Sequence, residues 1–282
     1  MRGPDRAAVL RAFHRAAPTY ASKDFLHAEI RARLLERLDP VRLEPHTVLD
    51  LGAGPPAASG AYAARFPGSH LIAIDAVPAM LGAAPQGWSR LCADAARLPL
   101  PDACADVAVA NMLLPWCADP LAVLAEARRV LRYPGLFAFA TLGPDSLQEL
   151  RTAWSRVDSH SHTHSFIDMH DLGDALIHAG FAEPVLDIEK LTITYRGLDR
   201  LVADLRDVGA TDLSEGRRRT LTGAGRWSAM TQAYDQLRDE TGTLPVTVEV
   251  VFGQAWTGER MANLRDPTGG IAVPLGQIMR RR

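Results

Sequence analysis

The sequence predicts an α/β protein with an open, mostly parallel sheet of seven strands, an antiparallel edge, N-terminal helices and a late helical insertion. Three observations predict this fold. Short apolar runs alternate with helical segments from residue 47 to residue 179. The run TVLDL at 47–51 leads into glycines, as a strand does before a ligand-binding turn. Two long segments near the carboxyl end, 185–195 and 246–256, read as a pair of antiparallel strands, and the second alternates valines with polar residues.

The first helices and strands are predicted from a change in the spacing of apolar residues. Residues 6–38 are expected to be helical, because apolar side chains recur three or four positions apart until an Asp-Pro pair ends the pattern. Two apolar runs, 47–51 and 71–75, enclose an alanine-rich helical stretch at 57–66. Strand, helix and strand within about 30 residues form the βαβ unit of a parallel sheet.

The same alternation continues along the chain. A helix is expected to begin at Asp119-Pro120 and to run to Leu131, since proline suits the first turn of a helix. A later helix at 168–179 has Asp168 as its candidate cap. Further strands are expected at 89–92, 105–110 and 136–142.

Changes in residue composition and hydrophobic pattern divide the chain into five expected segments. Residues between the two late strands are polar and helical, and the tail is marked by glycine and proline. The segments are an N-terminal helical cap at 1–45, an α/β core at 46–196, a helical lid insertion at 197–243, a final core strand at 244–260 and a flexible tail at 261–282.

Composition excludes several classes of protein. A net charge of −2 gives no nucleic-acid signature. No run approaches the length of a membrane span, and the start lacks the apolar core of a signal peptide. The cysteines Cys92, Cys104 and Cys117 have no CxxC spacing, so we expect a reducing compartment, the cytoplasm, and neither a disulfide framework nor a bound metal.

Ligands of open α/β sheets bind beyond the carboxyl ends of the strands, so we looked there for candidate residues. Asp50, Gly52 and Gly54 end the first strand, where glycines permit a tight turn and close approach to a ligand. Asp75 ends the second strand, 23 residues after Gly52, where a carboxylate accepts hydrogen bonds from ribose hydroxyls. These spacings predict a nucleotide-binding site.

The next two strand ends extend this site. Asp94, after the third strand, is placed to meet an adenine amino group, and Asn111 ends the fourth strand, facing the reacting groups. Gly52-x-Gly54-x-x-Ala57 also satisfies a dinucleotide fingerprint, which would imply NAD. The antiparallel pair at the end of the chain and the lack of a second nucleotide-binding half argue against NAD.

Several blocks together carry a family resemblance. VLDLGAG, IDAVPAML and ADAARLPLPDACADVAVANMLLPW resemble the ordered motifs of class I S-adenosylmethionine-dependent methyltransferases. TLGPDSLQELR and FIDMHDLGDALIHAGF are similar to the malonyl-acyl-carrier-protein O-methyltransferase family of biotin synthesis, and the likeness covers about residues 10–256. It implies a Rossmann-like methyltransferase sheet, conversion of S-adenosyl-L-methionine to S-adenosyl-L-homocysteine, and an acidic acyl-carrier protein bearing malonyl-phosphopantetheine as partner.

The resemblance also implies roles for single residues. Tyr20 would close over the methyl donor, and Arg151 is our candidate anchor for the acceptor carboxylate, because an Arg fork suits that group. From its place after the fourth strand, and not from the resemblance, Trp116 is expected either to line the cofactor pocket or to pack in the core. The expected cofactor-binding residues are Tyr20, Asp50, Gly52, Gly54, Asp75, Ala76, Met80, Asp94, Ala95 and Asn111, and the expected basic rim for the carrier protein is Arg11, Arg15, Arg128, Arg129 and Arg132.

One departure keeps two alternatives open. Related methyltransferases commonly read GxGxG, and the third glycine falls on Pro56, beside Pro55. Losing one neutral hydrogen bond there should cost about 0.5–1.5 kcal/mol, roughly tenfold in affinity. The alternatives are a non-catalytic cofactor-binding protein and a relative of the arginine-hydroxylating complex I assembly factor, which the tail IAVPLGQI resembles.

The histidines His160, His162, His164 and His170 lie in a polar stretch without metal-ligand spacing, so we expect them to be loop residues.

Overall fold

The computed structural model describes residues 3–82, 88–214, 220 and 222–258. Its sheet has seven strands in the order β3-β2-β1-β4-β5-β7-β6. β1 to β5 are parallel, and β7 runs antiparallel to both of its neighbours, so the expected fold class is confirmed. The strands are β1 Thr47–Leu51, β2 His70–Asp75, β3 Ser89–Cys92, β4 Ala105–Asn111, β5 Leu131–Leu142, β6 Phe181–Tyr195 and β7 Leu244–Thr257.

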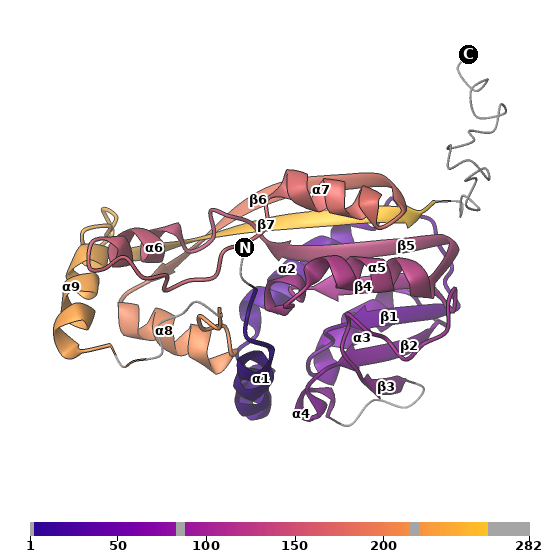
Figure 1. Cartoon of the computed structure of the whole chain (residues 1–282), viewed down its shortest axis with the longest axis horizontal. Helices are drawn as coiled ribbons and strands as arrows, with labels where there is room; N and C mark the ends of the chain where they lie inside the picture. Colours follow the sequence, from indigo (N-terminus) through magenta and orange to yellow (C-terminus); the bar gives the residue numbers. More distant parts are fainter. Residues whose placement is uncertain (1–2, 83–87, 215–219, 221, 259–282) are drawn as a thin grey trace, which may run out of the picture.

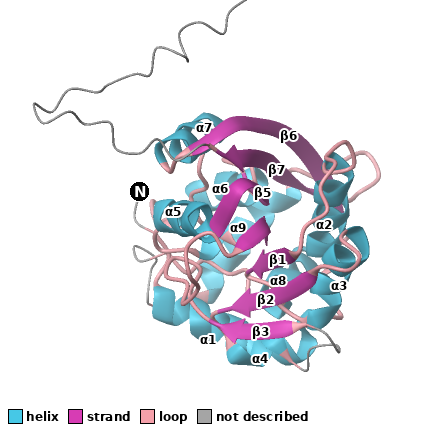
Figure 2. Ribbon diagram, turned by 90° about the vertical axis from the view of Figure 1, so that its right-hand side faces the viewer, coloured by secondary structure: helices cyan, strands magenta, loops and turns pink. Residues whose placement is uncertain are grey.

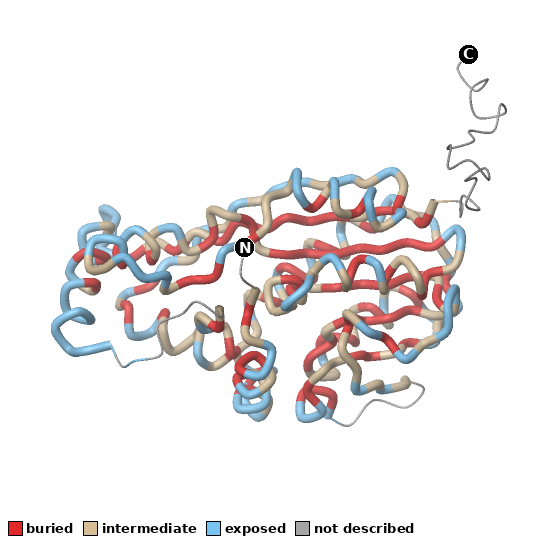
Figure 3. The backbone as a smooth tube through the Cα atoms, in the orientation of Figure 1, coloured by how far each residue is buried: buried red, intermediate tan, exposed pale blue. Residues whose placement is uncertain are grey.

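Helices cover both faces of this sheet (Figure 2). Successive strand residues point to opposite faces, so Val48 packs with Ile30 on one side while Leu49 packs with Val123 on the other. The first face is covered by α2 Phe25–Arg37 and α3 Pro56–Arg65, and the second by α5 Pro120–Val130 and α7 Met169–His178. Figure 3 shows the resulting core as buried central strands between half-buried helices.

β6 and β7 are much longer than the parallel strands and extend beyond them (Figure 1). Their pairing ends at Tyr195, opposite Leu244, so the segment between these residues lies at the tip of a long hairpin. The remaining helices are α1 Arg6–Tyr20, α4 Pro78–Leu81, the 3₁₀ helix η1 Leu114–Trp116, α6 Gln148–Ser155, α8 Leu198–Asp207 and α9 Ala224–Asp235. Figure 1 shows α6, α8 and α9 gathered at the hairpin tip, with α1 beside α8.

Some element boundaries differ from the sequence expectation. The first helical stretch is divided into α1 and α2 by a turn at residues 21–24. β5 begins at Leu131, where a helix was expected to end, because the chain enters the sheet there opposite Ala105 before an irregularity in the register. Asp168 caps α7 as predicted, accepting from the His170 N–H at 2.8 Å. The tail at 261–282 lies outside the described residues.

None of the helices in the described part of the chain is both long and apolar enough to cross a lipid bilayer. Among the same residues, no group of three or more His, Cys, Asp or Glu side chains is arranged to hold a metal ion.

Candidate active site at the carboxyl ends of the strands

The turn after β1 forms the floor of the site. Gly52 and Gly54 have φ angles of 69° and 62°, in the left-handed region that favours glycine. A Cβ on Gly52 would lie 2.8 Å from the Leu113 Cδ1 atom, so no side chain fits there. A Cβ on Gly54 would meet nothing within 4 Å. The backbone at Gly54 is therefore open to a ligand.

Asp75 ends β2 directly beside this turn. One of its carboxylate oxygens accepts from the Gly54 N–H at 3.0 Å and the other from the Val77 N–H at 2.8 Å. Burial raises the pKa of Asp75, and the two backbone donors oppose that rise. The carboxylate is thus fixed at the edge of the cavity described next.

A cavity of about 120 Å³ lies between α1 and the carboxyl ends of β1, β2 and β4. We call it the strand-end cavity. Apolar side chains such as Val77 and Leu113 form much of its wall, and Trp116 lines it as expected. Eight of the ten expected cofactor-binding residues line it: Tyr20, Gly52, Gly54, Asp75, Ala76, Met80, Ala95 and Asn111.

A smaller pocket continues from the strand-end cavity toward α2 and α3. This inner pocket is polar, and it shares the glycine turn, Tyr20 and Asn111 with the larger cavity. Within the described residues, three buried atoms that line it have no hydrogen-bond partner: His27 Nδ1, the Tyr62 hydroxyl and Asn111 Oδ1. Buried polar atoms without a partner are rare in proteins, so their presence indicates that a polar ligand completes the pocket.

Asp50 and Arg31 bring opposite charges to the inner pocket. Asp50 is 2% exposed and accepts from the Ser59 hydroxyl at 2.6 Å. Burial raises the pKa of Asp50 to about 7, against the lowering effects of Ser59 and Arg31. Arg31 is 9% exposed and lies 3.6 Å from Asp24. A carboxylate and a guanidinium in one pocket suit a ligand that carries both charges, such as an α-amino acid.

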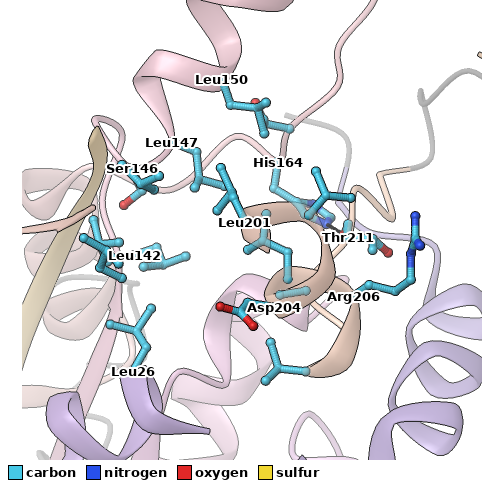
Figure 4. Close-up of a pocket in the computed structure, with 18 of the residues that line it drawn as sticks. Leu26, Leu142, Ser146, Leu147, Leu150, His164, Leu201, Asp204, Arg206 and Thr211 are labelled. Atoms are coloured by element: carbon cyan, nitrogen blue, oxygen red, sulfur yellow. Dashed lines mark hydrogen bonds between the residues drawn. The ribbon is translucent and has the colours of Figure 1, made fainter. Parts of the chain in front are cut away.

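A third, larger cavity of about 220 Å³ lies under α8. Its walls are mainly aliphatic, and Figure 4 shows Leu142, Leu147 and Leu201 converging on it, so we call it the apolar cavity. In the same view the Asp204 carboxylate points inward, and the Arg206 side chain extends away from the centre.

The three spaces meet at a shared set of side chains. Met112 and Trp116 line both the strand-end cavity and the apolar cavity. His27 lines both the apolar cavity and the inner pocket, and its ring lies 5.5 Å from that of Tyr20. The strand-end cavity and the inner pocket thus form one chamber, and the apolar cavity forms a second chamber that adjoins it at these side chains.

Two expected site residues do not line these spaces. Asp94 pairs with Arg6 at 2.9 Å and also accepts from the Ala96 N–H, while its neighbours Ala93 and Ala95 line the strand-end cavity. The Arg151 guanidinium donates to the carbonyl of Pro144, within its own loop. Arg151 is therefore held away from the apolar cavity, although Leu147 and Leu150 of the same segment line it.

The expected basic rim is wrong for three of its five members. The three arginines lie near the amino end of β5, so they are at the opposite end of the strands from the site: Arg128, Arg129 and Arg132. Arg129 pairs there with Glu126 at 2.8 Å, and Arg132 pairs with Asp106 at 3.1 Å. The reason is that α5 runs antiparallel to the strands, so its carboxyl end points away from the cavities. Arg11 and Arg15 are exposed on α1, on the side of the strand-end cavity.

Pro55 and Pro56 leave the site open. Pro56 is the first residue of α3, where a backbone N–H would have no helical partner, so the missing N–H of proline costs the helix nothing. Pro55 precedes it in extended conformation. Pro55 lines the inner pocket, whereas Pro56 lies toward Gly82. The paired prolines therefore do not fill the strand-end cavity.

The sequence interpretation missed His27, Arg31 and Tyr62. A signal was present, because His27 and Arg31 share the three-and-four spacing of Ile30 and Leu34 on α2. Polar residues within such an apolar stripe are directed toward the sheet, so they are buried and require partners.

Comparison with known proteins identifies the class that this fold and site define. Residues 49–139 match the model of the methyltransferase domain family. The structure is similar to that of an S-adenosylmethionine-dependent methyltransferase from Thermotoga maritima, with a TM-score of 0.52 and 19% identity, covering 89% of this chain and 100% of that one. The chain is an enzyme with the fold of this class of methyltransferase.

Closer relatives define the particular family. The chain is 43% identical to the malonyl-[acyl-carrier protein] O-methyltransferase of Laribacter hongkongensis, covering 89% of both chains. It is 42% identical to the enzyme of the same name from Methylovorus sp., over 93% of this chain and 92% of that one. The chain belongs to the malonyl-[acyl-carrier protein] O-methyltransferase family.

Proposed function

We propose that this enzyme transfers a methyl group from S-adenosyl-L-methionine to the free carboxylate of a malonyl thioester on an acyl-carrier protein. The observation that carries the proposal is the meeting of the strand-end cavity and its polar inner pocket with the separate apolar cavity at the carboxyl ends of the strands. The names of the relatives at 43% and 42% identity support the choice of acceptor. They also support a place in biotin synthesis.

The residues of the strand-end cavity suit the nucleoside part of this cofactor. Asp75 would accept from the ribose hydroxyls at the end of β2. Ala76, Met80 and Ala95 would pack against the adenine ring. Asp94 would reach the adenine amino group only if its carboxylate, now bonded to Arg6 and to the Ala96 N–H, turned toward the cavity.

The inner pocket suits the amino-acid part. Asp50 would attract the ammonium group and Arg31 the carboxylate, and the open backbone at Gly54 would allow close approach. The Tyr62 hydroxyl and Asn111 Oδ1, both buried without a partner among the described residues, would gain hydrogen bonds. The residues present therefore fit the group.

The reaction needs alignment more than acid–base chemistry. When bound, the cofactor supplies a methyl group on a positively charged sulfur, and the acceptor carboxylate is already ionised at neutral pH. Tyr20, Met112 and Trp116 would keep water from the junction of the chambers, which favours a step in which opposite charges disappear. Holding the reactants in line is worth up to about 7–11 kcal/mol.

The acceptor would enter through the apolar cavity, with the segment at 197–243 acting as its lid. Basic side chains on this side of the molecule could meet an acidic carrier protein: Arg11 and Arg15 on α1, Lys23 after it and Arg206 on α8. Lys23 and Arg206 line the apolar cavity itself. In the proposed docking surface these residues take the place of the three arginines that lie at the amino ends of the strands.

Three measurements test this function. Isothermal titration should show binding of S-adenosyl-L-methionine. The absence of heat at millimolar ligand would exclude the proposed methyl transfer. Radiolabelled methyl transfer should then be compared for malonyl-acyl-carrier protein and malonyl-CoA. Rescue of biotin-free growth in a strain lacking this methyltransferase separates the proposal from an assembly-factor role and from a non-catalytic binding protein.

A further inference from the structure

His27 occupies a distinctive position in the site. It lies in the first turn of α2, close to the end of β4, where the Asn111 side chain donates to the His27 carbonyl at 3.0 Å. Its side chain borders the inner pocket on one side and the apolar cavity on the other. An acceptor in the apolar cavity therefore meets His27 where the two reactants come together.

The His27 ring has an unused hydrogen-bonding atom. The residue is 9% exposed, and within the described part of the chain Nδ1 has no partner. The other buried polar groups of the apolar cavity differ in this respect or in position. Ser146 is bonded to the backbone of Glu249, and His164 accepts from the Leu213 N–H. Thr163 has an unpartnered hydroxyl but does not border either cofactor-side space.

The surroundings of His27 favour a neutral ring. Burial lowers the pKa of His27 to about 4, and the Arg31 guanidinium on the same helix adds to this effect. Other ionisable groups around it are Tyr20 on α1, Lys23 and Asp24 in the preceding turn, and Asp50 on β1. A neutral imidazole carries one N–H and one bare nitrogen, so it can donate without carrying charge.

A neutral donor suits this reaction better than a cation. The carboxylate loses its charge as the ester forms, so a cation would stabilise the reactant more than the transition state and would slow the step. A neutral N–H still orients the oxygen, and it keeps an acceptor when the ester has formed. This argument favours His27 over an arginine fork at the attacking oxygen.

We propose that the His27 ring donates a hydrogen bond to the carboxylate of the acceptor and thereby selects thioesters that end in a free carboxylate. The inference rests on the proposed function, because it assumes a carboxylate acceptor. It assigns His27 as a substrate-binding residue, and Arg151 as a residue that fixes its own loop.

Binding without turnover tests this assignment. Malonyl-acyl-carrier protein and acetyl-acyl-carrier protein differ in the terminal carboxylate, and their dissociation constants can be measured with S-adenosyl-L-homocysteine present. A hydrogen bond to a charged group contributes about 10- to 100-fold in affinity. His27→Phe should reduce the preference for the malonyl form by about that factor, and His27→Asn should keep part of it. His178→Asn, at an exposed histidine, should keep all of it.

The outcomes separate the two proposals. If the parent enzyme transfers no methyl group to malonyl-acyl-carrier protein, the proposed function fails and His27 loses its role with it. If the parent transfers the methyl group but binds the malonyl and acetyl forms equally, only the His27 assignment is overturned. If the parent shows the preference and His27→Phe retains it in full, only the His27 assignment is overturned. If His27→Phe weakens binding of S-adenosyl-L-homocysteine and of both carrier proteins equally, the residue is structural and the assignment also fails.

Discussion

Asp50 and His27 shift in opposite directions within one small pocket, and this opposition should appear in the stability of the protein. The pKa of Asp50 is raised from 3.8 to about 7, so the folded state holds more protons and this residue's contribution to stability falls as pH rises from about 4 to 7. The pKa of His27 is lowered from 6.5 to about 4, so the unfolded state holds more protons and its contribution rises over pH 4 to 6.5.

Urea denaturation between pH 4.5 and 7 of the parent and two variants measures this pair. Relative to the parent, Asp50→Asn should gain stability as pH rises, since the falling contribution is removed. His27→Phe should lose stability as pH rises, for the opposite reason. Two variants with parallel, pH-independent offsets would show that neither pKa is shifted in the folded protein.

Asp50 should also make cofactor affinity depend on pH. In the proposed binding mode the ligand is cationic near Asp50, and with a pKa of about 7 only about a tenth of this carboxyl is ionised at pH 6. We expect S-adenosyl-L-methionine to bind several-fold more tightly at pH 7.5 than at pH 6 in the parent enzyme. Isothermal titration of Asp50→Asn is the control, and it should show weaker binding without this trend. An equal slope in both proteins would place the titrating group elsewhere.

At the scale of elements, the start of α3 carries the departure from the family's glycine pattern. Pro56→Gly would restore a backbone N–H at the first residue of α3. We expect S-adenosyl-L-methionine to bind up to about tenfold more tightly. The free energy of unfolding should fall by about 0.4–1 kcal/mol or more, because the unfolded chain gains freedom.

Titration calorimetry and urea denaturation of the same Pro56→Gly sample give both quantities. Pro56→Ala is the matched control for the donor, since it restores the N–H without the flexibility of glycine. If the affinity is unchanged in both variants, this N–H does not face the ligand.

The elements also show what could be predicted from sequence. Asp75 and Asn111 could be placed because strands of a parallel sheet deliver their carboxyl ends to one edge, whatever the detail of packing. Arg151 could not, because its neighbours Leu147 and Leu150 reach the apolar cavity while its own side chain turns back to Pro144. The direction of a side chain in a single helical turn depends on contacts that spacing does not determine.

At the scale of the whole molecule, the β6–β7 hairpin joins the core to the helices over the apolar cavity. Tyr195 and Leu244 are paired neighbours, so residues 196–243 can in principle be replaced by a two-residue turn without breaking the sheet. With an Asn-Gly turn in their place, we expect S-adenosyl-L-methionine to bind within a few-fold of the parent value. Methyl transfer to malonyl-acyl-carrier protein should be lost.

Circular dichroism and calorimetry of this shortened chain check its fold and its cofactor binding. Retained methyl transfer would show that the segment does not form the lid. A folded protein that no longer binds the cofactor would show that α8 also shapes the strand-end cavity, through its contacts with α1. The position of this segment between the two late strands could be predicted from its polar composition, but its contacts with the amino-terminal part of the chain could not.

A continuous chain of contacts connects the residues near 213 with the amino-terminal helix α1. The Asp5 N–H donates to the Leu213 carbonyl at 2.8 Å, and the Leu213 N–H donates in turn to the His164 ring. The His164 ring lies edge-on to Trp116, whose ring meets Phe13 of α1 at 5.3 Å. If the acceptor binds over this segment as proposed, a displacement of residues near 213 would therefore also move the first helix, which borders the strand-end cavity. Release of the methylated acceptor and exchange of S-adenosyl-L-homocysteine for a new methyl donor are then expected to be coupled.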